Sequence, residues 1–213
     1  MSPSQKTALK AGLALLCVAA LVWLVVRTVR GRGPYHVERV ELSGWTLVAA
    51  PPDDAALVAL VPPPPLSTDL FQQLFQRTGR ALVAPAHPTV PLVLRTEYAD
   101  SLQGVLSTED IIDTARDAGI ETARFEPVCL GQHQKSGSNG SDVYFVLFDA
   151  PAFDDCREKL TPLFPEHAGA FPYEPKALSP ILTIAATDRE FARWWPLAVK
   201  TDLDCRASLR VTD

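Results

Sequence analysis

Two residues near the middle of the chain have side chains whose types and spacing could do chemistry together. Cys129 and His133 are spaced Cys-x-x-x-His, at the mouth of a polar run rich in glycine and serine. A thiolate beside an imidazole is a nucleophile with its base, and a third group usually orients that base. One hypothesis is therefore a cysteine-dependent hydrolase or a thiol-redox enzyme that uses Cys129 with His133.

The sequence does not complete this pair. Asp142, Asp149 and His167 are the candidates for a third group, but their spacing does not bring them to the site. A zinc site needs three or four ligands, and two are local here. His87-Pro88-Thr89 resembles half of a paired His-x-[Ser/Thr] phosphoesterase motif, and the sequence holds no second copy. We therefore expect a structural cysteine beside a solvated histidine, with no metal, no cofactor and no catalysis.

The remaining cysteines bear on the redox compartment. Cys156 and Cys205 each follow acidic residues, in the runs Asp154-Asp155-Cys156 and Asp202-Leu203-Asp204-Cys205. If the domain lies outside the cytoplasm, Cys156 and Cys205 are the candidate pair for a disulfide between a helix and the last strand. Three cysteines outside the N-terminal apolar segment leave one unpaired, and spacing does not determine the connectivity.

Charge is distributed unevenly along the 213 residues. Positions 1–36 hold five of the 20 basic residues and no acid, so positions 37–213 carry 15 basic residues against all 25 acidic ones. A domain with that excess of negative charge repels phosphate backbones, and we expect no nucleic-acid partner. Hydrophobic residues make up 47% of the chain, which indicates a folded protein rather than a disordered one.

The N-terminal region contains an apolar segment. From Ala11 to Val26 the chain reads AGLALLCVAALVWLVV, without a charged residue. As a helix this segment is roughly 24 Å long, and Lys10 and Arg27 can snorkel to extend the span. We therefore predict a tail and a single transmembrane helix within residues 1–30, followed by a linker at 31–36. A cleaved signal peptide, a lipid-modified Cys17 and a buried soluble helix are the alternatives.

The orientation of the anchor is nearly balanced. Lys6 and Lys10 precede the apolar segment, whereas Arg27, Arg30 and Arg32 follow it. The positive-inside comparison is therefore close to a tie. The short N-terminal tail suits a signal anchor that sends the following domain across the membrane. We expect an extracytoplasmic domain, with the cytoplasmic side as the alternative.

Behind the anchor, the pattern predicts a mixed α+β fold in two regions. Residues 37–95 read as a small βααββ subdomain, with Pro62–Pro65 as a polyproline spacer between its helices. In residues 96–213 the clearest helix begins at Ser107 or Thr108 and ends at Gly119. Counted from Val90, the order is β-α-β-β-α-β, which is the ferredoxin-like order. The expected elements are strands at 37–42, 81–84, 90–94, 122–130, 143–149, 181–186 and 205–211, and helices at 53–60, 67–79, 107–119, 152–160 and 188–195.

One stretch resembles a known module. Val37-Glu38-Arg39-Val40-Glu41-Leu42-Ser43-Gly44 follows the anchor, and two expected helices and two expected strands then lead to PLVLRTE at 91–97. This order is similar to that of the POTRA module of membrane-anchored bacterial division proteins. The Pro62–Pro65 run has no place in that pattern, and the rest of the chain does not follow it.

Several features together favour one function. The anchor, the polar loop at 131–141, the ferredoxin-like order and the lack of an assembled catalytic set indicate a single-pass membrane-anchored, non-enzymatic interaction or assembly domain. Its expected partners are the membrane and another protein.

Overall fold

A computed structural model describes residues 17–18, 20–22, 33–51, 55–134, 141–161, 171–197, 199 and 201–213. The chain separates into two compact units, Met1–Gly33 and Pro34–Asp213. Most of the expected anchor lies outside the described residues. Within the described ranges, no helix has the length and apolar character needed to cross a membrane. Three helical residues of the N-terminal unit, Val18, Leu21 and Val22, have exposed side chains.

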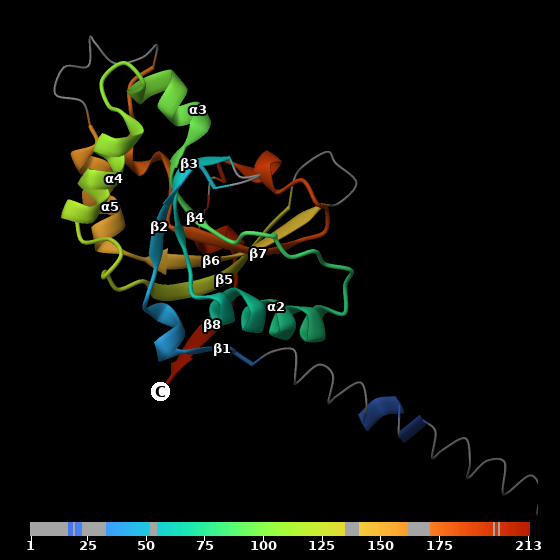
Figure 1. Ribbon diagram of the computed structural model, residues 1–213. Helices are drawn as coiled ribbons and strands as arrows, with labels where there is room; N and C mark the ends of the chain where they lie inside the picture. Colours follow the sequence, from blue (N-terminus) through green and yellow to red (C-terminus); the bar gives the residue numbers. More distant parts are fainter. Residues whose placement is uncertain are drawn as a thin grey trace, which may run out of the picture. The chain divides into compact units, whose positions relative to one another are not determined.

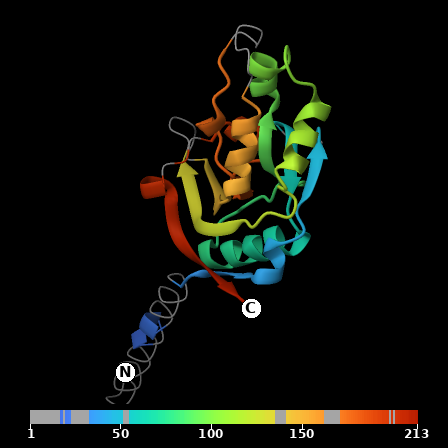
Figure 2. The ribbon, with the colours of Figure 1, turned by 90° about the vertical axis from the view of Figure 1, so that its left-hand side faces the viewer.

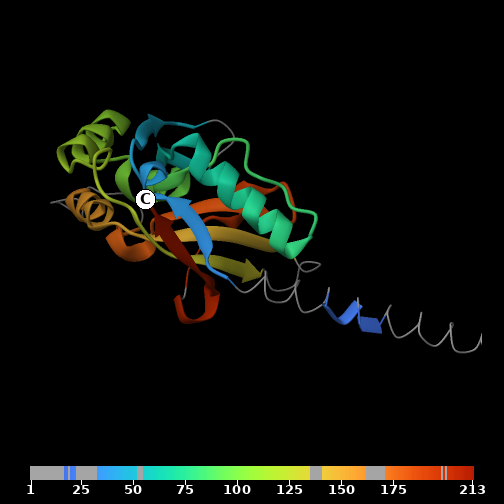
Figure 3. The ribbon, with the colours of Figure 1, turned by 90° about the horizontal axis from the view of Figure 1, so that it is seen from below.

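A five-stranded sheet joins the two ends of the Pro34–Asp213 unit (Figure 1). The first strand is parallel to the last, with Tyr35 opposite Leu209, and the other pairs are antiparallel. Figure 3 shows these two strands side by side and running in the same direction. In spatial order the strands are β1 (Tyr35–Glu38), β8 (Cys205–Thr212), β5 (Glu126–Gln134), β6 (Asp142–Asp149) and β7 (Ile181–Ala186).

A second, antiparallel sheet has three strands, in the order β2 (Thr46–Ala49), β3 (Ala56–Val61) and β4 (Val90–Leu94). A bridge between Val83 and Ala186 also links the chain before β4 to the end of β7. Figures 1 and 2 show α4 and α5 together near one end of the domain and α2 near the other. The helical elements are η1 (Arg39–Leu42), α2 (Pro64–Thr78), α3 (Arg95–Glu97), the π-helical turn η2 (Tyr98–Leu102), α4 (Thr108–Asp117), α5 (Pro151–Lys159), η4 (Pro175–Ala177), η5 (Phe191–Trp194) and α6 (Thr201–Asp204).

Strands β5, β6 and β7 of the five-stranded sheet carry buried apolar residues on both faces. One face contributes to the larger core, which includes the stacked rings of Trp45 and Phe125, with centroids 4.5 Å apart. The other face carries a smaller core that includes Phe145 and Trp194. Gly131 on β5 makes room for the Phe145 ring, because a Cβ at position 131 would lie 2.3 Å from that ring. This double burial explains why β6 has a continuous apolar sequence.

Two helices have the termini that the sequence indicates. Ser107 caps α4, since its hydroxyl accepts from Asp110 N–H at 3.1 Å while the Asp110 carboxylate accepts from Ser107 N–H at 2.8 Å. The hydrogen bonds from Ser107 hold the pKa of Asp110 below its usual range. Helix α2 ends at Gly79, which adopts a left-handed φ of 60° and donates its N–H to Phe75 O. The predicted stops at Gly79 and Gly119 are confirmed.

The mixed α+β class is confirmed, but the ferredoxin-like arrangement is not formed. From Val90 the longer elements follow in the order β4, α4, β5, β6, α5 and β7, with the short helical elements α3 and η2 between β4 and α4. However, β4 pairs with β3 in the smaller sheet, whereas a ferredoxin-like fold needs its four strands in one sheet. The expected division at 95–96 does not separate two units either. Strand β1 pairs with β8, and residues 34–213 form one unit.

Three local expectations were also wrong. Residues 56–61 form the central strand β3 rather than a helix, because a short apolar run fits a doubly covered strand as well as a helix. Pro64 and Pro65 form the first turn of α2 rather than a polyproline spacer, since proline is well tolerated at the first positions of a helix. The expected helix at 188–195 is the short 3-10 turn η5. The βααββ order of the POTRA resemblance is therefore absent.

Candidate functional site

The structure does not bring Cys129 and His133 together as a nucleophile and base. Both lie on β5, which continues to Gln134. Four residues along a strand separate their Cα atoms by about 13 Å. Cys129 forms a disulfide with Cys205, and His133 Nδ1 lies 3.1 Å from Asp204 Oδ1. In this oxidised form Cys129 has no thiolate to offer.

The expected disulfide between Cys156 and Cys205 is also corrected. Cys205 lies opposite Gly131 on the neighbouring strand β5, which brings it within 5.7 Å of Cys129, measured between Cα atoms. Strand pairing decides this connectivity, and cysteine spacing does not reveal it. Cys156 is a free thiol on the buried face of α5. Burial raises the pKa of Cys156 to about 11, so it stays protonated at neutral pH.

Of the groups considered for a third position, Asp142 belongs to a different cluster and Asp149 is exposed at the end of β6. His167 lies outside the described residues. Among the residues that the structure describes, no three His, Cys, Asp or Glu side chains are placed to hold a metal ion. The chemistry expected of Cys129 and His133 therefore has no assembled site in this part of the chain.

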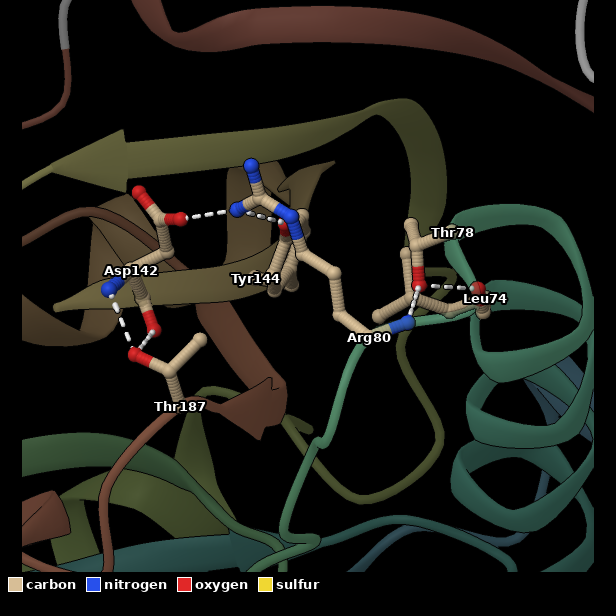
Figure 4. Close-up of polar contacts among 6 residues, drawn as sticks. All are labelled: Leu74, Thr78, Arg80, Asp142, Tyr144 and Thr187. Carbon is tan, nitrogen blue, oxygen red and sulfur yellow. Dashed lines mark hydrogen bonds and ion pairs between the residues drawn. The ribbon is translucent and has the colours of Figure 1, made fainter. Parts of the chain in front are cut away.

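Asp142 joins the end of α2 to β6 and β7 (Figure 4). Arg80, which follows the helix-ending Gly79, ion-pairs with Asp142 and also donates to Tyr144 Oη at 3.3 Å. Asp142 N–H donates to Thr187 Oγ1 at 2.8 Å. Burial raises the pKa of Tyr144. These contacts link the residue after the end of α2 to β6 and to the residue after β7.

Arg157 is a buried arginine that the sequence analysis did not identify. Its side chain has no exposed surface, and its guanidinium donates to Glu97 Oε1 at 2.6 Å. It also donates to Glu97 Oε2 at 3.2 Å and to three backbone carbonyls, those of Leu92, Glu174 and Pro175. These contacts tie β4, α3 and the chain around η4 to α5. The available signal was a charged residue on the apolar face of α5, next to Cys156.

An apolar groove of about 680 Å³ lies among the described residues. Its floor is the face of β2 and β3 that carries Val48 and Val61. The first turns of α2 form one wall through Pro64 and Phe71, and the chain before β4 forms another. This volume lies in the range of sites that take drug-sized ligands or short peptide segments. We call this cavity the β2 groove.

The wall formed by α2 offers hydrocarbon rather than hydrogen-bond donors. Pro64 and Pro65 have no N–H, and Leu66 N–H donates to Pro63 O at 3.2 Å. The hydroxyls of Ser67 and Thr68 both donate to Pro64 O, at 3.3 and 3.0 Å. A helix N-terminus ordinarily attracts anions through its free N–H groups. The prolines at this start remove most of that attraction and favour an uncharged ligand.

Ala49, the last residue of β2, is one of the residues that line the groove. Ala50 N–H donates to Leu57 O at 2.6 Å, and Ala49 lies opposite Val58. Hydrogen-bonded and non-hydrogen-bonded pairs alternate along an antiparallel ladder. The N–H and C=O of Ala49 therefore point away from β3, toward the free side of the sheet.

Leu47 confirms this alternation. It lies two residues before Ala49, and its N–H donates outward, to Glu121 Oε1 at 2.9 Å. Ala49 N–H has no such acceptor among the described residues. Ala50, the next residue on the rim, has a φ of 46° although it is not glycine. The left-handed region costs a residue with a Cβ roughly 1–2 kcal/mol. The edge of β2 is thus open at Ala49, beside a rim with a strained backbone.

Comparison of the chain with protein-family models, with curated proteins and with solved structures gives no match. A function for this chain therefore has to rest on its own geometry.

Proposed function

We propose that this chain is a single-pass membrane-anchored, non-enzymatic interaction domain that binds an extended, uncharged segment of a partner protein. The segment adds a strand to the edge of β2 and places alternate side chains in the β2 groove. The observation that carries this proposal is the open backbone edge at Ala49, which borders an apolar cavity of about 680 Å³. Strand addition draws affinity from such backbone groups and specificity from side-chain pockets beside them.

The lining of the groove supports an uncharged partner segment. His87 is the one titratable side chain among the described lining residues, and it is exposed. Val48, Val61 and Phe71 contribute apolar surface, which is stabilised by removal from water. A charged side chain entering this cavity would lose hydration without gaining an ionic partner.

The anchor and its orientation complete the proposal. Residues 11–26 hold the domain at a bilayer, and the domain lies on the extracytoplasmic side. The apolar sequence of that segment supports the first part. The Cys129–Cys205 disulfide supports the second, since disulfides persist in oxidising compartments and are rare in the cytosol of most organisms.

Site-specific photo-crosslinking in native membranes tests the proposal. A photoreactive amino acid in place of His87 is expected to give an adduct with one segment of one partner, mapped by mass spectrometry. The same residue in place of Asp117, exposed on α4, is the control and is expected to give no such adduct. Ala49→Pro removes the outward N–H of residue 49 and should abolish the adduct.

The matched control for Ala49→Pro is Thr46→Ala, a substitution on the same strand that leaves the backbone N–H and C=O of Ala49 in place. Adducts at position 87 that survive Ala49→Pro and also survive Val48→Asp would exclude the groove as the binding site. An adduct with a small apolar molecule instead of a protein would show that the groove binds a small ligand and would contradict the protein partner.

A thiol-redox enzyme is the second candidate, because Cys129 forms a disulfide whose other half, Cys205, directly follows the acid that contacts His133. A redox enzyme would exchange this disulfide with small thiols at neutral pH. Incubation with glutathione, followed by acid quenching and mass spectrometry, should then trap a mixed disulfide on Cys129 or Cys205. Buried Cys156 is the internal control, since its high pKa keeps it unreactive. We expect no mixed disulfide, in keeping with a non-enzymatic domain.

A further inference from the structure

A basic strip lies on the exposed side of β8 and β1. The residues of β8 alternate, so that Arg206, Ser208 and Arg210 are exposed while Ala207 and Leu209 pack against the larger core. Strand β1 continues this surface, because exposed His36 lies opposite Arg210. The smaller core covers this side of the sheet further along, at β6 and β7. The strip at β8 and β1 remains uncovered by described residues.

The charge of this strip contrasts with that of the domain around it. Residues 37–213 carry 15 basic and 25 acidic residues. Five described arginines form ion pairs with acidic side chains, namely Arg39, Arg80, Arg116, Arg124 and Arg157. Neither Arg206 nor Arg210 has a carboxylate within ion-pair distance among the described residues. Two exposed guanidinium groups, four residues apart on one strand, therefore present unneutralised positive charge.

The strip lies where the chain enters the domain. Strand β1 begins at Tyr35, opposite Leu209, and the two strands are parallel. Arg206 precedes Leu209 on β8, so it lies toward the end of β8 that pairs with the first residue of β1. The seven residues 27–33 connect the apolar segment to Pro34, and they span at most about 25 Å even when fully extended. An anchored domain thus keeps this end of the sheet within reach of the lipid headgroups.

We propose that the strip formed by His36, Arg206, Ser208 and Arg210 docks on a bilayer surface that contains anionic lipids. This inference rests on the proposed anchor, and it adds a surface and a ligand chemistry, the phosphate of a lipid headgroup. Arginine suits that ligand because its planar guanidinium donates two parallel hydrogen bonds to phosphate oxygens. Glu38, the acid on the same side of β1, lies two residues further from the tether.

Docking fixes the orientation of the domain on the membrane. When the strip contacts the headgroups, the sheet is attached to the membrane by the tether and by Arg206 and Arg210, and not by the tether alone. The β2 groove lies on a different sheet, and its edge carries none of these residues. A partner could therefore bind β2 while the strip stays on the lipid.

The test uses the full chain in vesicles, with a thiol placed in the strip. The chain carries Cys17→Ser and His36→Cys, and it is reconstituted in phosphatidylcholine alone or mixed with phosphatidylglycerol. His36 suits the probe because its backbone, not its side chain, bonds to Gln73. The readout is the rate of labelling by a membrane-impermeant maleimide. Asp117→Cys on α4 replaces His36→Cys in the control chain.

We expect labelling at position 36 to be roughly tenfold slower in the phosphatidylglycerol vesicles than in phosphatidylcholine, because each basic residue near an anionic surface adds to the attraction. High salt should restore the rate. Arg206→Glu with Arg210→Glu should remove the protection. Lys159→Glu with Arg189→Glu makes the same charge change at exposed residues elsewhere and should leave the protection intact.

Equal rates in the two lipids would overturn the docking. So would protection that is independent of lipid charge and grows with protein density, because a second copy or another protein would then cover the strip. Flotation of the chain with the vesicles is measured first. A chain that does not float would overturn the anchor and the docking together, whereas a chain that floats without protection would overturn the docking alone.

Discussion

The two sheets differ in how their outer edges are treated. On β1, Gln73 of α2 closes the edge, since its side-chain amide accepts from His36 N–H at 2.9 Å and donates to His36 O at 2.8 Å. Arg77, one helical turn later, donates to Pro34 O at 2.7 Å and lies over the Tyr35 ring. On β2, the Glu121 carboxylate accepts from Leu47 N–H, and no described residue bonds to the outward backbone groups of Ala49.

The two edges therefore differ in whether another chain can pair with them. Unpaired strand edges are templates for pairing with another chain, and proteins commonly block them with covering elements or polar side chains. Helix α2 blocks β1 with side chains spaced four residues apart, while its prolines and Phe71 form the wall of the β2 groove. A single helix therefore closes one edge and shapes the site beside the other.

Removal of the disulfide in the five-stranded sheet should have the greatest effect on stability and should leave the β2 groove unchanged. The Cys129–Cys205 disulfide closes a loop with a sequence separation of 76 and joins β5 to β8, the strand partner of β1. Cys129→Ser with Cys205→Ser should lower the free energy of unfolding by about 4 kcal/mol, on the loop-entropy account. Denaturant unfolding of the full chain in detergent measures this. Crosslinking at the β2 groove should persist under native conditions, and its loss would show that the two sheets are not independent.

The next effect opens the β1 edge. Gln73→Leu with Arg77→Leu removes the hydrogen bonds to His36 and Pro34, which should cost about 2 kcal/mol of unfolding free energy at roughly 0.5–1.5 per bond. The uncovered edge should also increase self-association, measured by light scattering. Gln72→Leu with Gln76→Leu changes exposed residues of the same helix and serves as the control. If both pairs behave alike, the edge bonds do not matter.

A smaller effect concerns the rim of the β2 groove. Ala50→Gly relieves the left-handed φ of 46° and should raise the unfolding free energy by about 0.5–1 kcal/mol, after the greater freedom of glycine in the unfolded chain is subtracted. Ala49→Gly, in the extended strand next to it, should instead lower stability. Thermal or denaturant unfolding should therefore show changes in unfolding free energy of opposite sign for the two variants. Equal signs would mean that Ala50 is not strained.

The smallest effect widens the open edge of β2. Glu121→Ala frees Leu47 N–H and should cost only about 0.5–1 kcal/mol of stability, the value of one hydrogen bond. The partner segment should crosslink more efficiently to this variant, because a second backbone donor becomes available beside Ala49. Glu109→Ala, exposed on α4, is the matched control. Reduced crosslinking to Glu121→Ala would mean that Glu121 itself contacts the partner.

The sequence predicted local features well where a short-range signal exists. The bounds of β4 and β7, the Ser107 cap and the Gly79 stop follow from apolar runs and from end-capping residues. The pattern predicts a helix where strand β3 lies, because six apolar residues fit both the helical and the strand period. The partner of each strand depends on long-range packing, so the pairing of β1 with β8 had no sequence signal.

The candidate site was missed for the same reason. The β2 groove draws on β2, β3, α2 and the chain before β4, and no motif links those segments in the sequence. Cys129 and His133 are close in sequence, yet the extended strand β5 holds them apart. The disulfide partner of Cys129 lies 76 residues away, and strand pairing decides it. Residue types indicated possible chemistry, whereas topology determined which residues meet.

Amide hydrogen exchange at Ala49 tests the central claim most directly. The full chain is compared in native membranes, where its partner is present, and after purification in detergent. We predict that the Ala49 amide exchanges at least about tenfold more slowly in native membranes, because a partner strand then accepts its hydrogen bond. The His36 amide, already bonded to Gln73, should exchange at the same rate in both. Equal exchange of Ala49 in the two preparations would contradict strand addition at β2.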